Sequence, residues 1–251
     1  MELYTMLNNL RLNTLSNDIF TDYEIDSYAH CADKNHYNSY PKTVVYIFNS
    51  RGFRDEEWPE DLSNATWCVG DSFTVGMGQP YEEIWPSLVR KMMPHQTFNV
   101  SLNGASNDWI SRKCIEILKE SNPKTIFVQW SYLHRREHPD STLNDEDRRL
   151  HYIKNQLVDP MKELRDFENF TKNVESLENE KKSTKVVHSF IPYFSDSIDN
   201  EGKILNFLDS INAQYFNYIK HLDYARDGHH YDIKTATEYA KTYCLKGLTN
   251  T

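Results

Sequence analysis

Two short segments, far apart in the chain, carry residues that could act together as nucleophile, base and acid. "GDSFTVGMG" (70–78) presents Ser72 after a short apolar run, and "RDGHHYD" (226–232) presents Asp227 and His230 three residues apart. A serine hydroxyl is a useful nucleophile only when a base takes its proton and a third group orients that base. Asp227 could hold one ring nitrogen of His230 and leave the other free as the base.

Each segment also has a simpler interpretation, which the residues alone leave open. Asp71 or Ser72 could merely cap a helix, and Asp227 with His230 could form a salt bridge in a surface loop. His229 competes with His230 for the role of base. The pair could also bind a metal ion with nearby acids, although adjacent residues rarely present both rings to one ion.

The glycines of 70–78 do not form a nucleotide-binding motif. No Lys-Ser/Thr follows them, which argues against a P-loop, and their spacing does not match GxGxxG. The segment is not a GxSxG elbow either, because Thr74 stands where the second glycine should be. A tight strand-to-helix turn that carries a nucleophile or a cap is the remaining interpretation.

Composition narrows the class of protein. The chain has 251 residues, 13% aromatic residues and a formal net charge of -9, which favour a folded domain and give no basic surface for nucleic acid. Its N-terminus lacks the apolar core of a signal peptide, and no segment reaches the roughly 20 apolar residues of a membrane span. Four widely spaced cysteines suit free thiols in a reducing compartment. We expect a cytoplasmic or otherwise soluble protein.

Strand and helix patterns alternate along the chain, which predicts an α/β fold with a largely parallel sheet. The predicted strands are 42–50, 65–70, 97–102, 124–130 and 185–194, and the predicted helices include 83–93, 108–121, 204–219 and 233–248. We interpret 1–43 as an N-terminal extension packed on the domain 44–251. Within that domain, the charged and helix-like stretch at about 138–184 is predicted to be an insertion over the mouth or flank of the sheet.

The combination of "GDSFTxG" and "RDGxH" resembles the SGNH hydrolases, also called GDSL-type esterases, over roughly residues 44 to 243. The upstream "FNSRGFRDEEWP" is similar to a segment of bacterial and phage members, and is compatible with a phage-encoded protein. The resemblance implies a three-layer α/β/α sandwich with a parallel sheet of about five strands. It also implies a triad of Ser72, Asp227 and His230.

The resemblance further implies an oxyanion hole, to which Ser72 and Gly104 of "SLNGASND" would contribute backbone N–H groups. The family's third block normally reads GxND, but here the matching strand end reads "VQWSYLHRRE" and has no asparagine. Asn107 from the neighbouring loop, or the hydroxyl of Ser131, is the expected replacement. A lost oxyanion donor typically costs on the order of a hundred-fold in rate.

The function implied is a serine esterase that works through an acyl-enzyme, without cofactor or metal, most readily on O-acetyl groups of carbohydrate. A small ester or an acetylated glycan is the expected partner. Acyl transfer to another sugar would use the same residues. The alternative from another class is a non-catalytic binding or structural module on a degenerate SGNH scaffold. Arg135, Arg136 and Glu137 are expected to anchor a loop, with substrate binding as the second interpretation.

Overall fold

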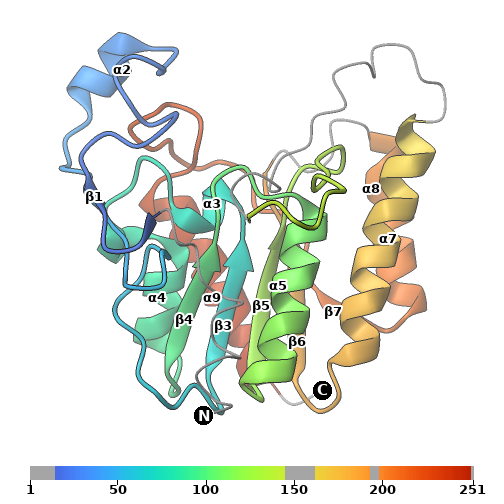
Figure 1. Ribbon diagram of the computed structural model, residues 1–251. Coiled ribbons are helices and arrows are strands. Elements are labelled where there is room, and N and C mark those ends of the chain that lie inside the picture. The colour runs from blue at the N-terminus through green and yellow to red at the C-terminus, as the bar shows by residue number, and fades with distance from the viewer. Residues whose placement is uncertain (1–14, 145–161, 193–197, 250–251) are drawn as a thin grey trace.

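The computed structural model describes residues 15–144, 162–192 and 198–249, and its centre is one parallel sheet (Figure 1). The strands lie in the order β4-β3-β5-β6-β7 and every pair is parallel. Their bounds are β3 Thr66–Gly70, β4 Thr97–Ser101, β5 Thr125–Trp130, β6 Lys185–Phe190 and β7 Gln214–Tyr215. The predicted α/β fold with five parallel strands is confirmed.

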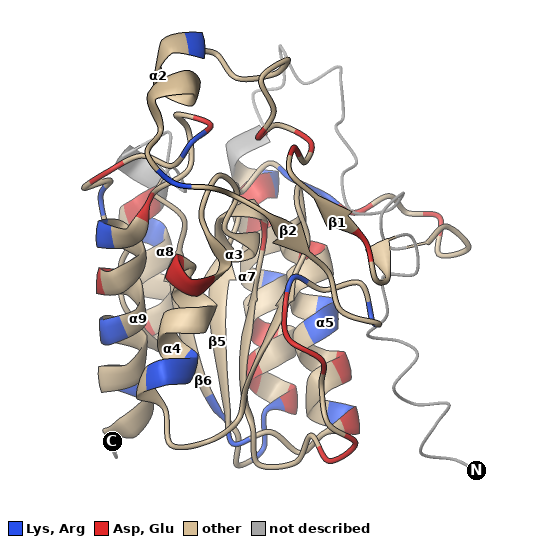
Figure 2. Ribbon diagram, turned by 90° about the vertical axis from the view of Figure 1, so that its left-hand side faces the viewer, with Lys and Arg blue, Asp and Glu red and all other residues tan. Residues whose placement is uncertain are grey.

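Helices cover both faces of the sheet, which makes the three layers of the sandwich (Figures 1 and 2). On one face α4 (Trp85–Met92) packs against α9 (Ile233–Leu248), and on the other α5 (Asn107–Glu120) packs against α7 (Lys162–Glu180). Helix α8 (Ile198–Ser210) contacts α7. Because helices lie over both faces, β3, β4 and β5 are buried along their whole length, including the polar residues Thr97, Asn99 and Ser101 of β4.

The short elements gather around the carboxyl end of the sheet. Helix α3 (Ser72–Val75) follows β3, and the 3-10 turn η3 (Tyr81–Glu83) leads into α4. Towards the N-terminus, α2 (Lys34–Ser39) stands above the sheet (Figure 1), while β1 (Ile19–Phe20) and β2 (Tyr46–Ile47) form an antiparallel pair of their own. None of the helices in the described ranges is long and apolar enough to cross a lipid bilayer.

Two predictions about elements need correction. Most of 42–50 is irregular, and its short strand β2 pairs with β1 rather than with the central sheet. The helix predicted at 204–219 ends at Ser210, and the chain then turns and adds the fifth strand, β7. The apolar residues of 211–219 pack against the core beside β7 without forming a helix. Their spacing in the sequence resembles a helical period, which explains the wrong prediction.

The predicted insertion at 138–184 also differs from the structure. The second part of this stretch, α7, connects the parallel strands β5 and β6 as a regular crossover helix. Its side chains Phe170, Val174 and Leu177 are buried in the main core. Residues 145–161 lie outside the described part of the chain. High charge density misled the prediction, since one exposed face of a covering helix can carry many charges while the other is apolar.

Asp55 is the buried centre of a polar network that ties "RGFRDEEW" to the sheet. Its carboxylate accepts hydrogen bonds from Trp58 Nε1 at 2.7 Å, Tyr81 OH at 3.0 Å and the backbone N–H of Asn99 at 2.9 Å, and it pairs with Arg90. Arg90 also donates to the carbonyl of Thr97. The network thereby fixes the segment before β3 to the edge strand β4 and to α4.

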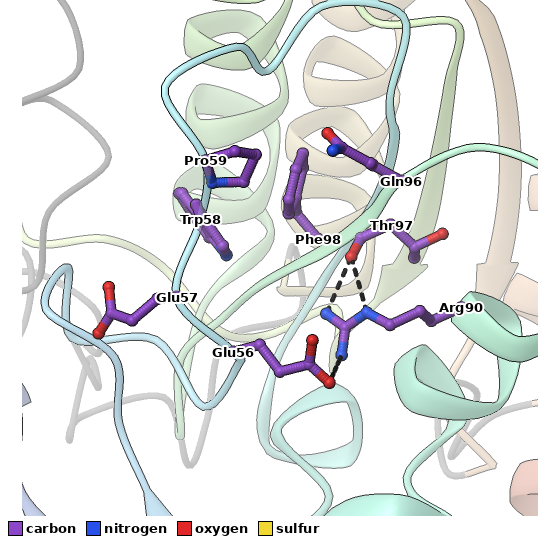
Figure 3. A pocket seen from close by; sticks show the side chains of 8 residues that line it. All are labelled: Glu56, Glu57, Trp58, Pro59, Arg90, Gln96, Thr97 and Phe98. Atoms are coloured by element: carbon purple, nitrogen blue, oxygen red, sulfur yellow. Dashed lines mark hydrogen bonds and ion pairs between the residues drawn. The ribbon is translucent and has the colours of Figure 1, made fainter.

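A surface pocket of about 430 Å³ opens beside this network (Figure 3). Figure 3 shows Arg90 on one side, bonded to Thr97 and Glu56, and the rings of Trp58 and Phe98 on the other. Its lining residues belong to the segment 56–59, to α4 and to 96–98. None of the residues predicted to do chemistry lines it.

We predict that Asp55→Ala lowers the free energy of unfolding by about 1–3 kcal/mol, because it leaves the half-buried Arg90 guanidinium and the buried N–H of Asn99 without this acceptor. Denaturant unfolding measures this. Glu56→Ala is the matched control, since its side chain is 67% exposed and its ion pair with Arg90 is at the surface; the expected change is within about 0.5 kcal/mol. Equal losses in the two variants would contradict the structural role of Asp55.

Candidate active site

The strand order brings the predicted residues to one edge of the sheet. Strand β3 lies between β4 and β5, so the strand order reverses at β3, and in open α/β sheets ligand sites generally form at the carboxyl ends of the strands beside such a point. Ser72 follows β3, Gly104 follows β4 and Ser131 follows β5. The register of β3 and β4 pairs Gly70 with Ser101, which puts the ends of these two strands level.

Ser72 is the first residue of the one-turn helix α3. Asp71 caps this helix, and its side chain accepts from the backbone N–H of Phe73 at 3.0 Å. Gly76 ends the helix in the left-handed region, with φ 76°, which a glycine adopts without the steric cost of a Cβ. The sharp entry and exit hold Ser72 at the start of the helix, where its N–H has no partner within the helix.

Ser72, His230 and Asp227 form a hydrogen-bonded chain. His230 Nε2 lies 2.8 Å from Ser72 Oγ, and His230 Nδ1 lies 2.5 Å from Asp227 Oδ2. The second carboxylate oxygen of Asp227 accepts the backbone N–H groups of His229 and His230, each at 2.9 Å. All three side chains are buried. The structure thus brings together the three residues that the sequence pattern paired.

The electrostatics around Asp227 keep its carboxylate ionised. Burial pushes the pKa of Asp227 upward, but the charge of His230 and the hydrogen bonds from His230 and His229 outweigh it and lower the pKa to about 2. The ring of Phe73 packs on His230 with centroids 4.4 Å apart. His230 is therefore oriented by a carboxylate on one side and an aromatic ring on another.

Gly78 allows the loop that carries Asp227 to approach the segment after α3. A Cβ at this position would lie 2.8 Å from Ala225 Cβ and 2.9 Å from the backbone nitrogen of Arg226, and Gly78 has φ +74°. Its carbonyl accepts the N–H of Arg226 at 3.1 Å. The second glycine of "GMG" is thus a contact surface for the loop that holds Asp227, which the sequence alone did not indicate.

Arg54 fixes the segment that follows α3. Its fully buried guanidinium donates to the carbonyls of Val75, Gly76 and Gln79, and to that of Val45. The ring of Tyr46 lies beneath it at 4.2 Å. The hydrogen-bond partners of Arg54 are thus carbonyl groups rather than a carboxylate, and they satisfy most of its buried donors.

Two backbone donors are available at the carboxyl edge. In the described part of the chain, no acceptor lies within hydrogen-bonding distance of the N–H of Ser72 or of Gly104. Gly104 has φ +74° in the turn after β4. Free N–H groups on two neighbouring strand ends are the kind of donor that can bind an oxyanion.

The expectation for Asn107 needs correction. Its amide nitrogen donates to the carbonyls of Ser131 and Tyr132 at 3.2 and 3.4 Å, and its oxygen accepts the N–H of Ser131 at 2.8 Å. The side chain is buried and fully used in fixing the loop after β5. Asn107 is therefore not placed to donate to an oxyanion in this structure.

Ser131 is also engaged, in a cluster that sequence reasoning missed. Its hydroxyl donates to Asp71 Oδ2 at 2.5 Å, and Arg135 Nη1 contacts the same oxygen at 3.0 Å and Ser131 Oγ at 2.9 Å. Thus the end of β5 is tied to Asp71, the residue before Ser72. The arginine three residues after "WSY" was the available signal, but nothing local pointed to Asp71.

The remaining candidates have structural partners. Arg136 pairs with Asp166 and Glu137 pairs with Arg112, which confirms the loop-anchor interpretation for both. His229 Nε2 lies 3.5 Å from Tyr132 OH, and desolvation together with the charge of His230 lowers the pKa of His229 to about 4. No group of three or more metal-binding side chains occurs among the described residues. The four cysteines are buried free thiols.

Comparison with known proteins identifies the fold. No family model and no curated protein sequence matches the chain, whereas solved structures of esterases do. An acetyl xylan esterase from Butyrivibrio proteoclasticus has a TM-score of 0.51 at 13% identity, and the match covers 77% of this chain and 67% of that one. A family 2 carbohydrate esterase from a Corynascus species has a TM-score of 0.52 at 10% identity, over 81% and 70% of the two chains.

A further carbohydrate esterase, whose active site displays divergent catalytic and non-catalytic binding functions, has a TM-score of 0.50 at 14% identity, over 82% and 68% of the two chains. The structural neighbours are thus SGNH-type and carbohydrate esterases, and the fold matches that of the SGNH hydrolases. At these identities the likeness identifies the fold.

We predict that Gly78→Ala lowers the free energy of unfolding by about 1–3 kcal/mol, because alanine is strained at positive φ and its Cβ would collide with the loop 225–227. Gly202→Ala is the control: a Cβ there meets nothing within 4 Å, and the residue is exposed within α8. This variant should gain about 0.5–1 kcal/mol. Denaturant unfolding compares the two, and unchanged stability of Gly78→Ala would refute the close approach.

Proposed function

We propose that this chain is a serine esterase of the SGNH type that cleaves esters through an acyl-enzyme, with O-acetyl groups on carbohydrate as the preferred substrate. The observation that carries the proposal is the hydrogen-bonded chain from Ser72 Oγ through His230 to Asp227. Its residue types and connectivity match those needed to activate a serine hydroxyl.

The proton transfers follow from which nitrogen of His230 faces which partner. Asp227 is an acceptor, so His230 Nδ1 carries the proton and Nε2 presents a lone pair to the Ser72 hydroxyl. Ser72 Oγ attacks the ester carbonyl while its proton passes to His230. The imidazolium then protonates the leaving alcohol oxygen as the tetrahedral intermediate collapses to an acyl-serine. A water molecule, deprotonated by His230, releases the acid and restores Ser72.

The charge that develops on the carbonyl oxygen needs donors. We assign this role to the N–H groups of Ser72 and Gly104, which have no other acceptor in the described residues. A third donor in the family's third block is replaced here by a loop whose polar groups hold Asp71. A two-donor hole supports a lower rate than a three-donor hole, by on the order of 10²-fold for each missing donor.

Acetylated carbohydrate is the substrate class that the structural neighbours favour, since two of them are an acetyl xylan esterase and a family 2 carbohydrate esterase. Polar and aromatic rings also lie on the loop that carries Asp227 and His230: His229 and Tyr224 are exposed, His221 is half-buried, and the half-buried Tyr132 faces His229. Such amphipathic side chains suit contact with a sugar. Acyl transfer to a second sugar would use the same residues.

A non-catalytic binding module is the second candidate, because one neighbouring carbohydrate esterase has an active site with both catalytic and non-catalytic binding functions. The departure at the third block is the feature of this chain that favours it. Turnover distinguishes the two, since a binding module would hold an acetylated glycan without releasing acetate.

We predict that the protein hydrolyses p-nitrophenyl acetate and releases acetate from acetylated xylan, and that Ser72→Ala and His230→Ala each lower kcat/KM by about 10³-fold or more. His95→Ala is the matched control, because His95 precedes β4 and so lies at the opposite end of the sheet from Ser72, which follows β3; it should retain activity within a few-fold. EDTA should have no effect. Equal rates for wild type and Ser72→Ala would exclude the esterase, and an effect of EDTA would favour a metal hydrolase.

A further inference from the structure

We infer that the turn Tyr23–Asp26 in the N-terminal segment is a clamp that positions both halves of the reaction centre, with Asp26 and Glu24 as positioning residues. Asp26 holds the residue before the triad acid, and Glu24 holds the residue before the predicted oxyanion donor Gly104. This inference rests on the proposed function, because the roles of Asp227 and Gly104 belong to it.

Asp26 is fully buried and forms an ion pair with Arg226. Its carboxylate accepts from Arg226 Nε at 3.0 Å and Nη2 at 2.7 Å, across 200 residues of sequence. Arg226 Nη2 also donates to the carbonyl of Thr21 at 2.7 Å, and its guanidinium lies over the ring of Tyr37 at 4.8 Å. The side chain next to Asp227 is thus held on several sides by the segment 21–37.

The same carboxylate closes a circuit that includes the nucleophile loop. Tyr46 OH donates to Asp26 Oδ2 at 2.5 Å and accepts the N–H of Gly78 at 2.7 Å. The carbonyl of Gly78 accepts the N–H of Arg226 at 3.1 Å, and Arg226 returns to Asp26. Because each member bonds to the next, a displacement of Asp26 would move the Gly78 loop and the Asp227 loop together.

Glu24 contacts the turn that follows β4 and carries Gly104. Its carboxylate accepts from Asn103 Nδ2 at 2.6 Å, and Asn103 is the residue before Gly104. Glu24 has φ +50°, which a non-glycine residue adopts only at a cost of order 1–3 kcal/mol in general, so the surrounding turn must impose it. The turn is closed by reciprocal backbone hydrogen bonds between Tyr23 and Asp26, which links the two contacts rigidly.

Further contacts of the same segment converge on the loop 223–232. His36 Nε2 donates to the carbonyl of Ala225 at 2.7 Å, and Lys42 bridges Asp232 at 2.8 Å and Glu83 at 2.6 Å. These bonds lie on either side of Asp227 and His230. Reactions of this kind depend steeply on geometry, since a shift of about 1 Å can cost on the order of 10²-fold in rate.

The test compares variants of the full chain with p-nitrophenyl acetate as substrate. Asp26→Asn keeps the size of the side chain and removes the ion pair; we expect kcat to fall by about 10-fold or more with KM within twofold. Asp22→Asn is the control, because Asp22 lies 3.8 Å from the same guanidinium but its side chain is 57% exposed; its kcat should stay within twofold of wild type. Arg226→Gln removes the same pair, so its effect should not add to that of Asp26→Asn.

Glu24 is tested with two substitutions. Glu24→Gly suits the positive φ and removes the carboxylate, so kcat should fall several-fold without a loss of fold, as circular dichroism checks. Glu24→Gln retains an oxygen that can accept from Asn103, so it should restore most of the rate.

A second readout does not depend on turnover. The proton between His230 and Asp227 should give a far-downfield ¹H NMR signal, which Asp26→Asn should shift or broaden and Asp22→Asn should leave in place. An unchanged signal and a kcat within twofold for folded Asp26→Asn would overturn the clamp. Failure of the proposed function is separate: wild type and Ser72→Ala would then have equal rates, and the NMR signal alone would decide the clamp.

Discussion

The hydrogen bond between His230 Nε2 and Ser72 Oγ is the interaction on which the site depends, and it joins residues 158 positions apart. Neither residue could hold that distance alone, because one sits at the start of a one-turn helix and the other on a loop. Arg54 fixes the segment after the helix, and Gly78 lets the loop approach it. Holding this geometry requires burying several polar groups, and burying a polar group costs free energy unless it is hydrogen-bonded.

The sequence allowed the architecture to be predicted where local patterns decide it. Strands were predicted at 65–70, 97–102, 124–130 and 185–194, and the structure has strands at Thr66–Gly70, Thr97–Ser101, Thr125–Trp130 and Lys185–Phe190. Residues 193 and 194 of the last prediction lie outside the described part of the chain. The fifth strand could not be predicted, because Gln214–Tyr215 is too short to carry a pattern and pairs only with β6. The stretch 42–50 has strand-forming residues, but its apolar side chains pack against the N-terminal segment in a cluster separate from the main core. It therefore does not join the central sheet.

The candidate site also contains residues that could be predicted from the sequence and residues that could not. Ser72, Asp227 and His230 were recognisable because each lies in a short motif, and their side chains meet in the structure; their catalytic roles remain our proposal. The groups that hold them were not recognisable, since Asp26, Tyr46, Gly78 and Arg226 are linked only through the tertiary fold. Asn107 was misassigned for the same reason: its type suited an oxyanion donor, but the loop after β5 uses its whole amide.

Covalent labelling of the nucleophile is the most direct test of the central claim. The wild-type protein would be incubated with a fluorophosphonate, digested, and mapped by mass spectrometry. The account predicts one phosphonylated serine, Ser72, and slow or no labelling in His230→Ala, because the hydroxyl then lacks its base. Absence of any adduct in folded wild-type protein, or an adduct at another serine with Ser72 unmodified, would contradict it.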